Sequence, residues 1–148
     1  MTAAALKAYD WEDCRQHAGL QGISQSYKKC FAPRDPRKLM WSVDIDACYA
    51  NSHPNDSRWD YGVATLMGAH PLLVFVEVHN MTSKETAKVI AKKAWLDRLL
   101  TVHTPELAPV QKRFVWVPTS ANTLPKGTPR VKRSLAIHGI SVQSSAAV

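Results

Sequence analysis

Hydrophobic residues alternate with polar ones along one segment of the chain and form an almost uninterrupted run in another. Residues 38–50 alternate, with Trp41 and Val43 on one face. Residues 58–66 have the composition of a second strand. Residues 72–79 are nearly all apolar, which is typical of a central strand buried on both faces. The pattern therefore predicts three consecutive strands, of which the third is the core of a sheet.

Helical patterns precede and follow these strands. Apolar residues in 9–31 recur at helical spacing, although two glycines divide this segment into two predicted pieces. A longer helix is predicted to begin at Thr82, because Thr82 and Glu85 have the spacing of a capping box. A short strand at 113–117 and a short helix at 130–137 follow. The predicted order is α, β, β, β, α, β, α.

The length of the chain limits this arrangement to one domain. With 148 residues, of which 45% are hydrophobic and 21% charged, the chain has the composition of an ordinary globular protein. We expect a single domain over residues 1–148, with a core at about 9–117 and a basic C-terminal extension at about 118–148. The sequence shows neither the apolar core of a signal peptide nor the run of about 20 apolar residues that spans a bilayer. We therefore expect a cytoplasmic protein.

The cysteines of the chain give no sign of a shared site. Cys14, Cys30 and Cys48 are three in number, and none has the CxxC spacing of a structural zinc site. This argues against both a zinc site and a disulfide framework. We predict that they are small buried hydrophobic residues, with a redox role as the alternative.

Positive charge is concentrated near the C-terminal end of the chain. The formal net charge is +7, and Glu106 is the last acidic residue. The basic residues that follow it are Lys112, Arg113, Lys126, Arg130, Lys132 and Arg133. Such an asymmetry is typical of proteins that bind a phosphate-bearing partner. We predict that the last four of these residues bind nucleic acid; the alternative is a solvated face that aids solubility.

A carboxylate stands near the end of the most hydrophobic predicted strand. An unpaired buried charge costs several kcal/mol, so Glu77 needs a partner, a metal ion or solvent at a cleft. Asp60 lies on the preceding predicted strand. If these strands pair as antiparallel neighbours, the two carboxylates meet within about 6 Å near one edge of the sheet, where a divalent cation would relieve their repulsion. We therefore predict a magnesium or manganese site there.

This combination of features resembles the PD-(D/E)XK nuclease superfamily, which has the restriction-endonuclease-like fold. The resemblance covers roughly residues 11–117. It consists of the αβββαβ order, an Asp that opens the second core strand, and a Glu late in an apolar third strand that a helix follows. The resemblance implies a central mixed sheet flanked by helices. It also implies that Asp60 and Glu77 are metal ligands and that Val78 offers its backbone carbonyl to the same ion.

The chain departs from the family pattern beside the two acids. His79 stands where the family usually has Lys, and the Pro before the motif Asp is missing unless Pro54 is its displaced counterpart. Neutral His can accept a proton or ligate a metal, so we expect His79 to be catalytic. Family members are known to relocate the Lys, and Lys84, Lys88 and Lys92 form one line on the predicted helix. Lys92 is the candidate catalytic lysine, and Lys84 and Lys88 are candidates for binding nucleic acid.

Each candidate has a simpler structural alternative. The metal pair could be a surface Asp and a salt-bridged Glu, the histidine could be an ordinary hydrogen-bonded residue at a strand end, and the lysine line could be a solvated helix face. A role as surface charge is favoured for Glu12, which falls where some family members carry a further acid. The same holds for Asp44 and Asp46, which share the polar face of their predicted strand.

Three hypotheses about function follow. The leading one is a magnesium-dependent nuclease in which metal-bound water attacks a phosphodiester, with DNA favoured over RNA as substrate. The second, favoured by the replacement of the motif lysine, is a catalytically degenerate nuclease fold that binds nucleic acid, a protein partner or a second copy of itself. The third is an RNA-binding protein built on the basic tail, but the chain lacks the strand motifs of an RRM and the GXXG loop of a KH domain. No membrane partner is expected.

Overall fold

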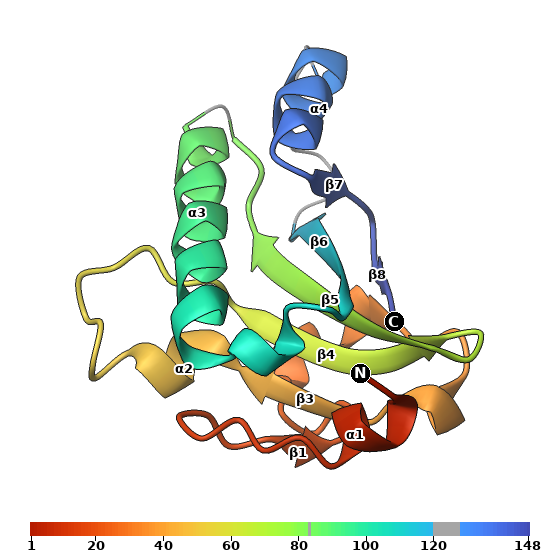
Figure 1. Ribbon diagram of the computed structural model, residues 1–148. Helices are drawn as coiled ribbons and strands as arrows, with labels where there is room; N and C mark the ends of the chain where they lie inside the picture. Colours follow the sequence, from red (N-terminus) through yellow and green to blue (C-terminus); the bar gives the residue numbers. More distant parts are fainter. Residues whose placement is uncertain (83, 120–127) are drawn as a thin grey trace.

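A computed structural model describes residues 1–82, 84–119 and 128–148 as a mixed α/β fold (Figure 1). In these residues the central sheet has six strands, in the spatial order β1-β3-β4-β5-β6-β7. They are β1 (His17–Ala18), β3 (Trp41–Asp44), β4 (Tyr61–Met67), β5 (His70–His79), β6 (Gln111–Pro118) and β7 (Ile140–Val142). A separate parallel pair joins β2 (Phe31–Ala32) to β8 (Ala146–Ala147).

Helices connect the strands and pack on the sheet. The α-helices are α1 (Ala3–Lys7), α2 (Ile45–Tyr49), α3 (Glu85–His103) and α4 (Thr128–Ile137), and the 3-10 helices are η1 (Gln25–Cys30), η2 (Pro36–Lys38) and η3 (Pro105–Leu107). The long helix α3 lies across one face of the sheet (Figure 1). Within the described part of the chain, none of these helices combines the length and apolar composition needed to cross a membrane. The predicted α/β class, with helices around a central mixed sheet, is confirmed.

The pairing of the sheet changes from antiparallel to parallel at β5. β3, β4 and β5 pair antiparallel, with Val43 opposite Gly62 and Tyr61 opposite Val76. The tight turn between β4 and β5 uses Gly68 at φ +65°, a conformation that glycine adopts without strain. β6 and β7 run parallel to β5, because α3 and α4 return the chain to the same end of the sheet before each strand.

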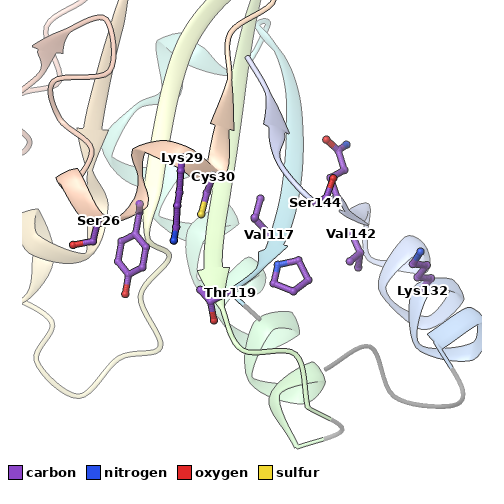
Figure 2. A pocket seen from close by; sticks show the side chains of 11 residues that line it. Ser26, Lys29, Cys30, Val117, Thr119, Lys132, Val142 and Ser144 are labelled. Atoms are coloured by element: carbon purple, nitrogen blue, oxygen red, sulfur yellow. The ribbon is translucent and has the colours of Figure 1, made fainter. Parts of the chain in front are cut away.

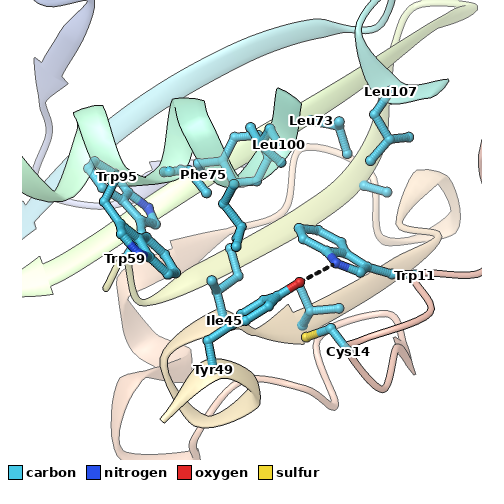
Figure 3. Packing of buried hydrophobic residues seen from close by; sticks show 14 of the residues in the cluster. Trp11, Cys14, Ile45, Tyr49, Trp59, Leu73, Phe75, Trp95, Leu100 and Leu107 are labelled. Carbon is cyan, nitrogen blue, oxygen red and sulfur yellow. Dashed lines mark hydrogen bonds between the residues drawn. The ribbon is translucent and has the colours of Figure 1, made fainter. Parts of the chain in front are cut away.

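The two faces of β5 belong to different hydrophobic clusters. Leu73 and Phe75 are fully buried in one cluster with Trp95 of α3 (Figure 3). Val74 and Val76 are equally buried in the second cluster, on the opposite face of the sheet. Successive side chains of a strand point to opposite faces, so the next residue on the α3 face is the acid near the end of β5.

The predictions for the middle of the chain are largely confirmed. β4, β5 and β6 correspond to the strands predicted at 58–66, 72–79 and 113–117. The predicted long helix is α3, but it begins at Glu85 rather than at Thr82. The backbone N–H of Glu85 donates to the carbonyl of Thr82 at 3.0 Å, while the Glu85 side chain contacts a histidine instead of closing a capping box.

The prediction of two helical pieces in residues 9–31 is wrong for the first piece and only partly right for the second. The segment contains β1, the 3-10 helix η1 and the first residue of β2, and Glu12, expected on a first helix, is exposed and outside any helix. Gly19 has φ +55°, which interrupts a right-handed helix. Gly22 lies so close to β3 that an added Cβ would stand 2.6 Å from the carbonyl oxygen of Ser42. The glycines therefore allow the chain to follow the sheet edge.

The strand predicted at residues 38–50 is correct only in its first half. β3 ends at Asp44, whose Oδ1 accepts a hydrogen bond from the backbone N–H of Ala47 at 2.8 Å and caps α2. Ile45 and Tyr49 are buried on the helix. Their spacing of four suits one face of a helix as well as one face of a strand, so alternation could not separate the two structures.

Cys14 and Cys48 form a disulfide, with Cα atoms 5.3 Å apart, which overturns the prediction that the cysteines are unpaired. Cys30 is the free cysteine and is buried, as predicted. The indole Nε1 of Trp11 donates to the hydroxyl of Tyr49 at 3.0 Å and makes a second link between the same two segments (Figure 3). Spacing along the chain carries no information about this contact, which depends on where the N-terminal segment packs.

The helix predicted at 130–137 is confirmed by α4, which is followed by Gly139 at φ +73°. The residues after α4 were predicted to be part of an extension, but they belong to the sheet and the core. β7 pairs with β6 at one side of the sheet, and Leu135 and Ile140 are buried in the cluster on the α3 face. Residues 128–148 therefore contribute both a strand and core side chains.

Candidate functional site

Asp60 lies directly before β4 and is fixed through its backbone and its side chain. Its carbonyl accepts hydrogen bonds from the backbone N–H groups of Ile45 at 2.8 Å and Asp46 at 3.3 Å, at the beginning of α2. Its Oδ2 accepts from the backbone N–H of Val78 in β5 at 2.9 Å. These bonds direct the carboxylate of Asp60 toward the end of the neighbouring strand.

Glu77 is fully buried on the face of β5 that α3 covers. Its Oε1 accepts a hydrogen bond from Nζ of Lys92. Its Oε2 is buried as well, and it has no hydrogen-bond partner within residues 1–82, 84–119 and 128–148. A buried carboxylate oxygen without a hydrogen-bond donor costs free energy. A function assigned to this site should therefore explain why Oε2 is placed there.

Lys92 brings the two acids together. Its Nζ contacts Oε1 of Glu77 and also lies 3.4 Å from Oδ1 of Asp60. The lysine comes from α3, whereas Glu77 is in β5 and Asp60 directly precedes β4, the strand paired with β5. Because one ammonium group touches both carboxylates, the predicted convergence of Asp60, Glu77 and Lys92 is present in the structure.

Burial and mutual repulsion control the charge of this cluster. Burial, with the nearby Asp60 carboxylate as a second cause, raises the pKa of Glu77 to about 8, although Lys92 acts in the opposite direction. Burial also raises the pKa of Asp60 against the lowering effect of Lys92. The two acids raise the pKa of Lys92 despite its burial, so it remains an ammonium group at neutral pH. The cluster therefore combines a carboxyl group that favours its protonated form with an ammonium group.

His79 lies next to this cluster and has a partner of its own. Its Nε2 is 2.8 Å from Oε2 of Glu85, in the first turn of α3. Lys88 contacts the other oxygen of Glu85 at 3.3 Å, and the carbonyl of His79 accepts from the indole Nε1 of Trp116 at 3.0 Å. The His79 side chain is 45% exposed, so it reaches solvent at the rim of the site. The pairing partner Glu85 was not predicted as a site residue.

The donor set of the cluster suits a hard cation. Carboxylate oxygens are the ligands that Mg²⁺ prefers, and the unpartnered Oε2 of Glu77 is free to serve as one. The N–H of Val78 points to Asp60, so its carbonyl points to the same edge of β5, since both groups of a strand residue face one side. No group of three or more His, Cys, Asp or Glu side chains within metal-binding reach occurs in the described residues.

The other acids that the sequence brought into question have structural roles. Asp44 caps α2. Oδ1 of Asp46 accepts from Nε of Arg58 at 2.9 Å, and Arg58 also donates to the carbonyl of His53 at 2.6 Å. Asp46 and Arg58 therefore hold the loop that leads into Asp60.

The predicted nucleic-acid-binding residues fall on two helices. Lys84 and Lys88 are exposed at the beginning of α3, and Arg130, Lys132 and Arg133 are exposed on α4. Lys126 lies outside the described residues. The two helices contact each other, so these exposed basic residues lie on neighbouring elements.

Comparisons of the chain with protein-family models, with curated proteins and with solved structures found no match. The geometry of the site is therefore the basis for an argument about function.

Proposed function

We propose that the chain is a divergent PD-(D/E)XK nuclease that hydrolyses phosphodiester bonds with the help of Mg²⁺ or Mn²⁺. Its core would be β3, β4, β5, α3 and β6, which correspond to the βββαβ part of the restriction-endonuclease-like arrangement. The observation that carries the proposal is the contact of one lysine, Lys92, with two acids: Glu77 in β5 and Asp60 directly before the paired strand β4. Nucleic acid, with DNA favoured over RNA, is the proposed substrate.

Asp60, Glu77 and the carbonyl of Val78 would hold the metal ion. When bound, such an ion supplies a Lewis acid and lowers the pKa of an attached water molecule. The protein's own part is to present oxygen ligands on rigid strands. The two bonds to the Asp60 carbonyl and the bond from Val78 to its side chain fix these ligands before any ion arrives.

Lys92 takes the place of the lysine that is missing from position 79. It reaches the acids from α3 instead of from β5, but it supplies the same ammonium group at the same pair of carboxylates. An ammonium group there can donate to a phosphate oxygen and to the attacking water, and so stabilise the charge that develops in the transition state. The replacement of the motif lysine by His79 is thereby compensated.

His79 and Glu85 would act at the rim of the site. Glu85 fixes one ring nitrogen of His79 at 2.8 Å, and the exposed remainder of the ring can contact a phosphate or accept a proton. Lys88 is positioned by the same carboxylate. These residues would orient the strand that is to be cleaved.

One observation favours a binding module without catalysis. Lys92 already offsets much of the repulsion between the acids, so the cluster is stable without a cation. In that case α3 and α4 would bind nucleic acid or a protein, and Asp60, Glu77 and Lys92 would serve only the fold. A variant at Lys92 distinguishes a nuclease from a binding module without catalysis.

A cleavage assay tests the proposal. Supercoiled plasmid, single-stranded DNA and RNA are incubated with the protein and Mg²⁺ or Mn²⁺, and cleavage is followed with and without EDTA. We expect metal-dependent cleavage that Asp60→Asn and Glu77→Gln abolish. Lys92→Gln should lower the rate by about 10²- to 10³-fold, the usual loss when one group that stabilises transition-state charge is removed.

Lys93→Gln is the matched control for Lys92→Gln. Lys93 is the adjacent lysine of α3, is similarly buried and binds Asp97 instead of the site. Its substitution should leave the cleavage rate nearly unchanged. Absence of metal-dependent cleavage of all three substrates by the wild-type protein, or equal loss in the two lysine variants, would contradict the proposal.

A further inference from the structure

A pocket lies at the end of β6, between η1 and α4, and Lys92 is not among its lining residues. Its volume is about 760 Å³, in the range of pockets that hold a small organic ligand. One wall is η1, the floor is the end of β6, and the other wall is α4 together with the segment after it (Figure 2). Nothing in the proposed catalytic arrangement uses this pocket.

The lining of the pocket combines an apolar floor with two positive charges. Val117, Pro118 and Val142 contribute apolar surface. Among the described residues of the lining, the charged ones are Lys29 and Lys132, and they stand on opposite walls with Val117 between them (Figure 2). An occupant with a flat apolar body and negative charge would match this lining.

An aromatic side chain completes the lining. Tyr27 is 38% exposed although it is a large hydrophobic residue. Its ring packs against Tyr61, with centroids 6.4 Å apart, and this contact fixes its orientation. A partly exposed aromatic ring beside lysines is the combination with which proteins stack a base and bind its phosphate.

The pocket and the acidic cluster share one end of the sheet. Pro118, in the pocket lining, is the register partner of His79 across β5 and β6. Paired strands lie about 4.8 Å apart, so the backbone at Pro118 is next to the backbone at His79. Ligands of open α/β sheets commonly bind beyond the carboxyl ends of parallel strands.

We infer that this pocket binds one unpaired nucleotide of a single-stranded nucleic acid, with the base on the apolar floor and against Tyr27 and the phosphate between Lys29 and Lys132. The inference rests on the proposed function, because it makes the occupant a nucleotide next to the one that is cleaved. It assigns a preference for single strands over duplex, since a paired base must lose its pairing and stacking before it can enter the pocket.

Binding without divalent metal tests the pocket separately from cleavage. In EDTA, the affinities for dAMP, for a short labelled single-stranded oligodeoxynucleotide and for the duplex of the same sequence are measured by titration. We expect the wild-type protein to bind dAMP and to prefer the single strand. In the double variant Lys29→Gln/Lys132→Gln, single-strand affinity should fall about tenfold or more, because two phosphate contacts are lost, and duplex affinity should change less.

Val142→Trp fills the pocket without changing charge, and should abolish dAMP binding while duplex binding persists. Lys7→Gln, at an exposed lysine of α1 outside the pocket lining, is the matched charge control. Folding of every variant is checked by thermal unfolding, and the lysine variants remain decisive if Val142→Trp does not fold. Unaltered single-strand and dAMP affinity in the double lysine variant would overturn the inference. Normal pocket binding with no cleavage in Mg²⁺ would instead overturn the nuclease proposal alone.

Discussion

The two faces of β5 show how differently one strand can use its side chains. On the face away from α3, Val74, Val76 and Val78 are buried among other apolar residues. On the α3 face, Leu73 and Phe75 are equally apolar, but the next side chain is an acid that is fully buried with a lysine. Burying an ion pair is rarely more stable than packing hydrophobic residues of the same volume. The α3 face therefore gives up stability for a charged cluster, which is what a functional site requires.

The largest effect on stability should come from Lys92→Met. This change leaves Asp60 and Glu77 as buried acids without their shared ammonium group. Breaking a buried ion pair on one side typically costs about 3–5 kcal/mol, and we expect a loss of that size in urea unfolding at neutral pH with EDTA. Mg²⁺ should restore part of the loss, because the cation replaces the missing charge.

Val76→Ala on the opposite face sharpens the comparison. It removes a fully buried side chain with no charge and should cost about 2 kcal/mol, from lost burial and a small cavity. Mg²⁺ should not restore this loss. If Lys92→Met and Val76→Ala lose the same free energy of unfolding and respond alike to Mg²⁺, the two faces of β5 do not differ as we expect.

The pH dependence of stability should come from the α3 face. Burial raises the pKa of Glu77 to about 8 in the folded protein, against an ordinary value of 4.5. Between these values the folded protein keeps a proton on Glu77 that the unfolded chain has released. The free energy of unfolding therefore decreases as the pH rises through this window. Unfolding in EDTA at several values between pH 5 and 8 measures the slope.

Glu77→Gln is the control for this pH dependence. It removes the titrating group and should flatten the decline between pH 5 and 8. Because metal binding needs the ionised carboxylate, Mg²⁺ should stabilise the wild-type protein more at pH 8 than at pH 6. A slope that is the same in the wild type and in Glu77→Gln would show that Glu77 does not titrate as we expect.

The smallest effect on stability should come from Glu85→Gln. Its contacts with His79 and Lys88 lie near the surface, where water and salt screen an ion pair so that it contributes little to stability. Cleavage should be affected more than stability, because the ring of His79 loses the carboxylate that orients it. We would measure the midpoint of unfolding and the cleavage rate in parallel. If Glu85 has a purely structural role, the midpoint and the rate should change together.

Much of the sheet could be predicted from the sequence because its long strands have strong patterns. The continuous apolar run of β5 and the acid near its end indicated a buried strand with a costly charge. The proximity of Asp60, directly before β4, to Glu77 of β5 followed from antiparallel pairing across a short turn. Lys92 was named as the candidate catalytic lysine among three lysines on one helix line, but its contact with the acids depends on the packing of α3, which the sequence does not give.

Short elements could not be predicted because tertiary contacts determine them. Residues 9–31 resemble a broken helix in sequence, but the chain there follows the edge of β3. β7 has only three residues and is defined by its pairing with β6 rather than by its own pattern. Glu85 was interpreted as a helix cap, and no local signal showed that its side chain turns back to His79.

The disulfide between Cys14 and Cys48 makes the stability of the fold depend on the redox state of its surroundings. It links residues 34 positions apart, and closing a loop of this length restricts the unfolded chain by about 2–4 kcal/mol. A reducing compartment such as the cytoplasm would break such a bond, whereas an oxidising one would keep it. The bond ends in α2, whose first N–H groups hold the carbonyl of Asp60. Thermal unfolding with and without dithiothreitol should differ accordingly, and purification under reducing conditions yields the less stable form.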